Sequence, residues 1–165
     1  MTICNIDDTI TQIKAGQRLM GLDVGKKTIG IALGDPGHKI ASPHRILWRQ
    51  KFSTDMAELF NEMEALAVGG LVIGWPLLMN GDKGPACDSV RDFAHALMRI
   101  KDVPVMFQDE RLSTHAVEKS MIEADLTRKK RHNKRDALAA SWILQSAFDQ
   151  YQQRYQNKKI KILDE

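Results

Sequence analysis

Three acidic residues that are far apart in the sequence occupy positions where the ends of strands and helices would expose them: Asp23, Glu110 and Asp136. Asp23 and Glu110 each stand at the end of an apolar segment, and Asp136 lies at the expected start of the last helix. Hydrolysis of a phosphodiester bond by two divalent ions uses carboxylates that hold the metals about 3.5–4 Å apart. Mg²⁺ and Mn²⁺ prefer such oxygen ligands to His or Cys. One interpretation of the three acids is therefore a two-metal phosphodiesterase.

Each acid also has a structural interpretation, because Asp at a strand end or a helix start commonly caps or turns the chain. Asp109 and Glu110 are adjacent, and successive strand residues point to opposite faces, so only one of them is expected in the site. The spacing does not say which. As the first residue of a helix, Asp136 would be stabilised by the positive helix end, by about 0.3–1 kcal/mol.

The positive charge is concentrated in one segment, residues 128–135, which we call the basic octet. It holds six of the 24 Lys and Arg residues; without it the formal net charge would change from +3 to −3, with 18 basic residues against 21 acidic. We predict a loop over residues 125–134 that brings these cations to a nucleic-acid backbone beside Asp136, although such a run can also be a solvated loop. The predicted substrate-binding residues in it are Arg128, Lys129, Lys130, Arg131, Lys134 and Arg135.

Two further cations are candidates for substrate phosphate. Lys27 lies in the turn after Asp23, where it could contact a scissile phosphate or simply be an exposed turn residue. Arg111 follows Glu110 and could hold substrate, although an ion pair with an acidic neighbour is slightly favoured. With 6% aromatic residues, a base-stacking platform is not expected, and backbone contacts should dominate recognition.

The composition excludes several classes of protein. The chain has 165 residues, 43% hydrophobic and 27% charged, which is typical of one globular domain. Its apolar runs fall short of the ~18 residues of a membrane span, and its N-terminus lacks the apolar core of a secretory signal. Cys4 and Cys87 form no disulfide framework, and with five scattered His they form no zinc motif. We therefore expect a cytoplasmic protein without a membrane partner.

The hydrophobic pattern predicts a mixed α/β fold in which helices pack on a sheet. Strands are expected at residues 19–24, 28–33 and about 45–49, joined as antiparallel hairpins, and at 71–73 and 104–108 as buried parallel strands. Helices are expected from Ser53 or Thr54 to a Gly69-Gly70 end, and at 85–100, 116–124 and 136–151. We expect one domain over residues 18–155, an N-terminal extension at 1–17 and a charged tail at 156–165, and assign no function to the last two.

Four motifs occur in one order: G-L-D-V-G-K-K-T-I-G-I-A-L-G-D from Gly21, G-W-P-L-L-M-N-G from Gly74, D-E-R-L-S-T from Asp109 and K-R-D-A-L-A-A from Lys134. Together they resemble the YqgF/RuvX family, described as Holliday-junction resolvases and as pre-16S rRNA nucleases. The resemblance covers about residues 19–151. It implies an RNase H-like fold and a nuclease dependent on Mg²⁺ or Mn²⁺, whose acidic positions match Asp23, Glu110 and Asp136. It also implies a bacterial cytoplasmic role in the maturation of small-subunit rRNA.

The chain departs from the family pattern at four positions: Thr28, where a basic residue is usual, Trp75, Leu78, and Ala139, where related resolvases often carry a fourth carboxylate. This favours pre-16S rRNA as the substrate over DNA, with the small-subunit precursor as a further candidate partner. Three alternatives stay open: a Holliday-junction DNA resolvase, a non-catalytic RNA-binding assembly factor, and an actin-like ATPase, which would need a second such domain. A monomer and a homodimer both fit the sequence.

Overall fold

The computed structural model describes residues 3–111 and 128–163, except the side chains of residues 128–134 and of Leu163. A five-stranded sheet forms the centre, in the order β3-β2-β1-β4-β5. The hairpin strands β1 (Arg18–Val24), β2 (Thr28–Gly34) and β3 (Ala41–Trp48) are antiparallel. Strand β1 is parallel to β4 (Val68–Trp75), which is parallel to β5 (Val105–Asp109). The mixed sheet expected from the pattern, with antiparallel strands at one edge, is confirmed.

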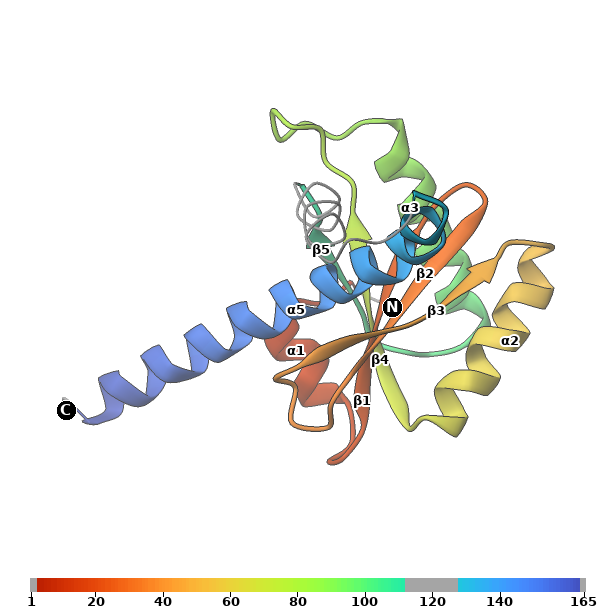
Figure 1. Ribbon diagram of the computed structural model, residues 1–165. Coiled ribbons are helices and arrows are strands. Elements are labelled where there is room, and N and C mark those ends of the chain that lie inside the picture. The colour runs from red at the N-terminus through yellow and green to blue at the C-terminus, as the bar shows by residue number, and fades with distance from the viewer. Residues whose placement is uncertain (1–2, 112–127, 164–165) are drawn as a thin grey trace.

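The two faces of the sheet bury separate apolar clusters because side chains alternate along each strand. Met20, Leu22 and Ile73 pack with helices α2 (Phe52–Ala65) and α3 (Pro85–Ile100) on one face. Leu19, Val72 and Met106 pack on the other face against helix α5 (Arg128–Leu163), as the crossing of α5 over the sheet in Figure 1 shows. Every odd position of β1 therefore faces α5, which fixes the direction of Asp23.

The N-terminal segment forms part of this second layer. Helix α1 (Ile6–Gln12) begins at Asn5, whose side chain accepts a hydrogen bond from the N–H of Asp8 at 2.9 Å. Ile6 is buried in the cluster beneath α5, and the N–H of Cys4 donates to the carbonyl of Val105 at 2.9 Å. Residues 3–12 thus cover the free edge of β5.

Helix α5 corrects one prediction. The expected loop over residues 125–134 is wrong for its described part, because α5 begins at Arg128 and runs for 36 residues. Lys and Arg are good helix formers, and residues 128–163 contain no Gly or Pro to stop the helix. Asp136 is therefore about two turns inside the helix, too far from the first turn to be stabilised by the positive helix end. The same helix continues through the predicted tail to Leu163.

A second correction concerns the end of α2. Gly69 and Gly70 do not end the helix: α2 stops at Ala65, Ala67 takes a left-handed φ of 54°, and both glycines lie in β4. Helix α3 begins and ends at the predicted residues, with Pro85 in its first turn. The predicted helix over residues 116–124 lies outside the described residues.

Candidate active site

Strand alternation brings Asp23 and Glu110 together. In β1, Leu22 packs toward α2 and α3, so the next residue, Asp23, points to the α5 face. In β5, Phe107 packs on the α2 and α3 side, so Gln108 and then Glu110 fall on the α5 side. Glu110 forms a side-chain hydrogen bond with Asp23, whereas Asp109 points the other way. The two adjacent acids thus lie on opposite faces, as alternation predicts, and Glu110 is the one beside Asp23.

These two carboxyl groups share a proton. Burial, and then the charge of Asp136, raise the pKa of Asp23 to about 6, although the hydrogen bond from Glu110 acts in the opposite direction. Burial, the charge of Asp23 and the hydrogen bond to Asp23 raise the pKa of Glu110 to about 7. The pair titrates as a unit, because two close carboxylates in a partly dry site repel each other when both are ionised.

Asp136 completes the acidic group from helix α5. The hydroxyl of Thr28, on β2, donates a hydrogen bond to one oxygen of the Asp136 carboxylate. The Nε of Arg135 lies 3.9 Å from the other oxygen. The charge of Asp136 acts on Asp23, so the three predicted acids do converge at the carboxyl ends of β1 and β5. We call Asp23, Glu110 and Asp136 the acidic cluster.

Glycines allow this approach. Gly30 is opposite Asp23 in the β1–β2 register, and a Cβ there would overlap the backbone oxygen of Asp136. A Cβ at Gly74, on β4, would overlap the Glu110 carboxylate and lie 2.6 Å from Cδ1 of Ile143. Helix α5 and the Glu110 side chain can therefore reach the sheet only because these positions carry no side chain.

The acidic cluster has the chemistry of a divalent-cation site. Its three carboxylates supply the oxygen ligands that hard cations prefer, and the raised pKa of Asp23 and Glu110 reflects repulsion that a cation would relieve. Within residues 3–111 and 128–163, however, no three His, Cys, Asp or Glu side chains are already arranged around a metal position. The Asp23–Glu110 pair could hold the ion once its shared proton had left, and Asp136 would complete the set with the oxygen that does not accept from Thr28.

The other predicted site residues have different surroundings. Arg111 forms an ion pair with Asp109, with Nη2 at 2.6 Å from Oδ2, so the ion-pair interpretation of Arg111 is confirmed. Hydrogen bonds from Arg111 hold the pKa of Asp109 below its usual range. Lys27 is exposed in the β1–β2 turn. Arg135 lies beside Asp136, whereas the side chains of Arg128, Lys129, Lys130, Arg131 and Lys134 lie outside the described part of the chain.

Two residues of this site were not identified from the sequence. Thr28 was noted only as a departure from a family pattern, although strand alternation places it on the same face as Gly30 and hence toward α5. Gly74 lies beyond the strand predicted at residues 71–73, and it is in fact the seventh residue of β4. Alternation along β2 and β4 could have placed both residues on the α5 face, but only if the bounds of these strands had been known.

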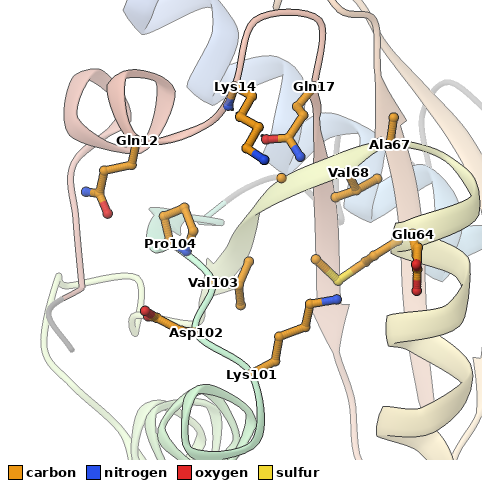
Figure 2. Close-up of a pocket in the computed structure, with 12 residues that line it drawn as sticks. Gln12, Lys14, Gln17, Glu64, Ala67, Val68, Lys101, Asp102, Val103 and Pro104 are labelled. Carbon is orange, nitrogen blue, oxygen red and sulfur yellow. Dashed lines mark hydrogen bonds between the residues drawn. The ribbon is translucent and has the colours of Figure 1, made fainter.

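A separate hollow lies at the opposite end of the parallel strands. It has a volume of about 490 Å³ and is bordered by the α1–β1 turn, the end of α2 and the α3–β5 connection. Figure 2 shows Lys14 and Lys101 together with Glu64 and Asp102 around it. Because the acidic cluster lies at the carboxyl ends of the strands, this hollow is not part of it.

Comparison with known proteins identifies the family. A sequence model of RuvX, described as Holliday junction resolvase, matches residues 17–150. The chain belongs to the RuvX family. Curated RuvX relatives carry the name "Putative pre-16S rRNA nuclease": one from Paramagnetospirillum magneticum is 45% identical over 86% of this chain and 92% of its own length. Another from Acidiphilium cryptum is 44% identical over 90% of this chain and 94% of its own length.

Solved structures support the RNase H-like resolvase fold of this RuvX chain. Thermus thermophilus RuvC, solved in complex with a Holliday junction substrate, superposes with a TM-score of 0.53, at 13% identity, over 82% of this chain and 96% of its own. Fowlpox virus resolvase, solved with Holliday junction DNA, gives 0.50 at 12% identity over 82% of this chain and 99% of its own. At these identities the likeness concerns the fold alone. No helix in the described ranges has the length and apolar character that crossing a membrane requires.

Proposed function

We propose that this RuvX chain is an endonuclease that uses Mg²⁺ or Mn²⁺ to hydrolyse phosphodiester bonds in the maturation of the 5′ end of pre-16S rRNA. The observation that carries the proposal is the acidic cluster, in which Asp23, Glu110 and Asp136 come from β1, the end of β5 and α5 to one place. The names of the curated relatives supply the RNA substrate. The proposal places the protein in the bacterial cytoplasm, with the small-subunit precursor as its partner.

In the proposed mechanism the acidic cluster holds two divalent ions. When bound, these ions supply the positive charge that lowers the pKa of an attacking water and stabilises the leaving oxygen. Thr28 orients Asp136 through its hydroxyl, and Gly74 leaves space for Glu110 beside Asp23. The proton shared by Asp23 and Glu110 must leave when the site is loaded, since both groups bind metal only as carboxylates.

Cations beside the acids offset their repulsion of an RNA backbone. Lys27 in the β1–β2 turn, Arg135 next to Asp136, and the rest of the basic octet are the proposed phosphate contacts. Arg111 can join them only by leaving Asp109, because its guanidinium is paired in the free protein. Such contacts give salt-dependent affinity without sequence preference, so the cleavage position would depend on RNA shape.

The decisive experiment compares cleavage of a pre-16S-like RNA by the purified chain and by Asp23→Asn, with Mg²⁺ or Mn²⁺ present. The variant keeps the size of the side chain and removes a metal ligand, so we expect a loss of at least about a hundredfold, more than the 10–100-fold typical of a lost outer-shell partner. Asp88→Asn on α3 is the matched control, because Asp88 is exposed and pairs only with Arg91 among the described residues. It should cut at the wild-type rate.

Other outcomes would identify a different function. Binding of the RNA without cleavage by either protein would indicate a non-catalytic assembly factor. Cleavage of a four-way DNA junction, with the RNA left intact, would indicate a resolvase, which the description of the family model favours. Against junction cleavage, the position of the fourth resolvase carboxylate is Ala139, which is buried and offers no ligand.

A further inference from the structure

The C-terminal part of α5 extends beyond the sheet. Tyr151 still packs against the apolar cluster, and Gln152 donates a hydrogen bond to the carbonyl of His38 at 3.3 Å. From residue 153 to 162 every side chain is exposed, including Tyr155 at 59% and Ile162 at 73%. We call residues 153–163 the C-terminal arm; Figure 1 shows it leaving the body of the molecule past α1.

The composition of the arm is strongly cationic. Residues 150–163 contain four basic residues and no acidic one, before Asp164 and Glu165 in the sequence. Arg154, Lys158 and Lys161 follow one another at i, i+4 and i+7, so they form a stripe along one face of the helix. Arg154 is held by an ion pair with Asp7 of α1 at 3.2 Å, which ties the base of the stripe to the body.

We propose that this stripe binds the backbone of the RNA substrate at a distance from the acidic cluster. The inference rests on the proposed function, which provides an RNA. At about 1.5 Å per helical residue, Arg154 lies about 27 Å and Lys161 about 38 Å along α5 from Asp136. B-form DNA rises about 3.4 Å per base pair and an A-form RNA duplex rises less, so this distance corresponds to at least roughly 8–11 base pairs of RNA. The arm therefore contacts only RNA that extends at least this far from the cleaved bond.

A second copy of this chain is the other possible binding partner of the arm, and the charge of the arm favours RNA over it. Tyr155 and Ile162 would provide apolar contacts for pairing two arms, but pairing would also place four cations of one helix against four of the other. Repulsion between these like charges opposes the pairing of two arms, whereas a polyanion such as RNA is attracted by every cation of the arm. The exposed ring of Tyr155 beside the stripe can also stack on an unpaired base.

The test uses two RNAs with the same cleavage site, one with about 5 base pairs on each side of it and one with about 20, so that only the second spans the roughly 8–11 base pairs to the stripe. Affinity is measured over a range of salt concentrations in the Asp23→Asn background, where the RNA stays intact. Neutralising the stripe with Arg154→Gln, Lys158→Gln and Lys161→Gln should weaken binding of the long RNA about tenfold or more. The salt slope should fall by about one to three units, while the short RNA binds as before.

A matched triple variant, Lys51→Gln, Arg99→Gln and Lys101→Gln, removes the same charge from the ends of α2 and α3, on the other face of the sheet, and should change neither RNA. Equal binding of the long RNA by stripe variant and parent, or an equal loss on both RNAs, would overturn the inference. So would a stripe-dependent dimer, seen by sedimentation, without any length effect. If the wild type cuts neither RNA but the stripe variant still loses affinity for the long RNA alone, only the nuclease proposal fails. If cleavage is normal but the stripe variant binds the long RNA as the parent does, only the proposed role of the arm is refuted.

Discussion

At the scale of single residues, the fold brings together carboxyl groups in the acidic cluster that repel one another when they are ionised. Asp23 and Glu110 are held close together in a partly buried place, and both have a raised pKa. The free protein accommodates this by keeping a proton between them. A divalent cation would provide the same relief with more charge, so under the proposed function the cluster would exchange protons for metal as it is loaded. Stability at this site should therefore depend on pH in a direction opposite to that of a salt-bridged acid.

The first prediction is that the metal-free protein loses stability as pH rises from about 4 to about 7. In this range the unfolded chain, whose acids have pKa values near 4, binds fewer protons than the folded protein, so the free energy of unfolding must fall. One unit of pKa difference is worth about 1.4 kcal/mol, so the single proton that the pair shares, bound about two units more tightly than in the unfolded chain, corresponds to a loss on the order of 3 kcal/mol. Denaturant unfolding in a chelator, at a series of pH values, measures it.

Asp23→Asn is the informative variant in that series, because it removes the charge that raises the pKa of Glu110. The free energy of unfolding of the variant should depend less on pH and should exceed that of wild type at pH 8, because a functional site commonly lowers the stability of the protein that carries it. Mg²⁺ added at pH 8 should stabilise wild type and not the variant. A wild-type stability that is flat or rises over this pH range would contradict the shared proton.

The second prediction concerns Thr28, whose hydroxyl donates to Asp136. We expect Thr28→Val, which keeps the shape of the side chain, to weaken metal binding and activity by about 10–100-fold, the usual effect of a lost outer-shell partner. Thr28→Ser should retain both. A calorimetric metal titration separates this positioning role from a structural one: a change in melting temperature with unchanged metal affinity, or tighter binding in the valine variant, would contradict it.

At the scale of elements, helix α5 and the sheet form the site between them. Alternation along β1, β2 and β5 selects the side chains on the α5 face, and small residues on that face let the helix come close. The local sequence was enough to predict the strands, the antiparallel edge and α3, because each has a strong period or a marked end. It was also enough to identify the three acids as a candidate group.

What could not be predicted depended on contacts between elements. The choice of Glu110 over Asp109 required the register of β5, which is set by the parallel pairing of Leu71 with Val105. The start of α5 was missed because a run of like charges was interpreted as a loop, although Lys and Arg favour helix. The roles of Thr28 and Gly74 depend on their contacts with α5 and Glu110, and α5 begins more than 50 residues later in the sequence than either of them.

The third prediction tests the space that Gly74 provides. In Gly74→Ala the new methyl group meets the Glu110 carboxylate and Cδ1 of Ile143, so Glu110 must move away from Asp23. We expect a stability loss of about 1–3 kcal/mol, as for other overpacked sites. Activity should fall further than this loss explains, and the pH dependence of stability should flatten. Gly84→Ala is the control, since its Cβ would only approach the flexible Leu78 side chain at 3.2 Å. A Gly74→Ala protein with the wild-type pH curve would show that Glu110 had not moved.

At the scale of the whole molecule, positive charge is gathered at the two ends of one helix. The basic octet forms the start of α5, next to the acidic cluster, and the C-terminal arm forms its end. The part of α5 between these two segments crosses the sheet (Figure 1). The rest of the chain has 14 basic residues against 21 acidic ones, a formal net charge of −7. An RNA approaching the acids would therefore meet the octet at once, because Arg128 is only about 12 Å along the helix from Asp136, and would meet the arm only if it is long. The two segments should differ in their dependence on RNA length.

The fourth prediction uses this difference. Neutralising the octet with Lys129→Gln, Lys130→Gln and Arg131→Gln should weaken binding of the short and the long RNA alike, since both reach the cations beside the acids. The salt slope should fall by about one unit for each phosphate that the protein no longer neutralises. Filter binding over a range of salt concentrations, with circular dichroism to show that α5 stays helical, makes the measurement. An octet variant that binds both RNAs with wild-type affinity and salt slope would leave the octet as a solvated helix start, and the electrostatic attraction would then have to come from Lys27, Arg135 and the arm.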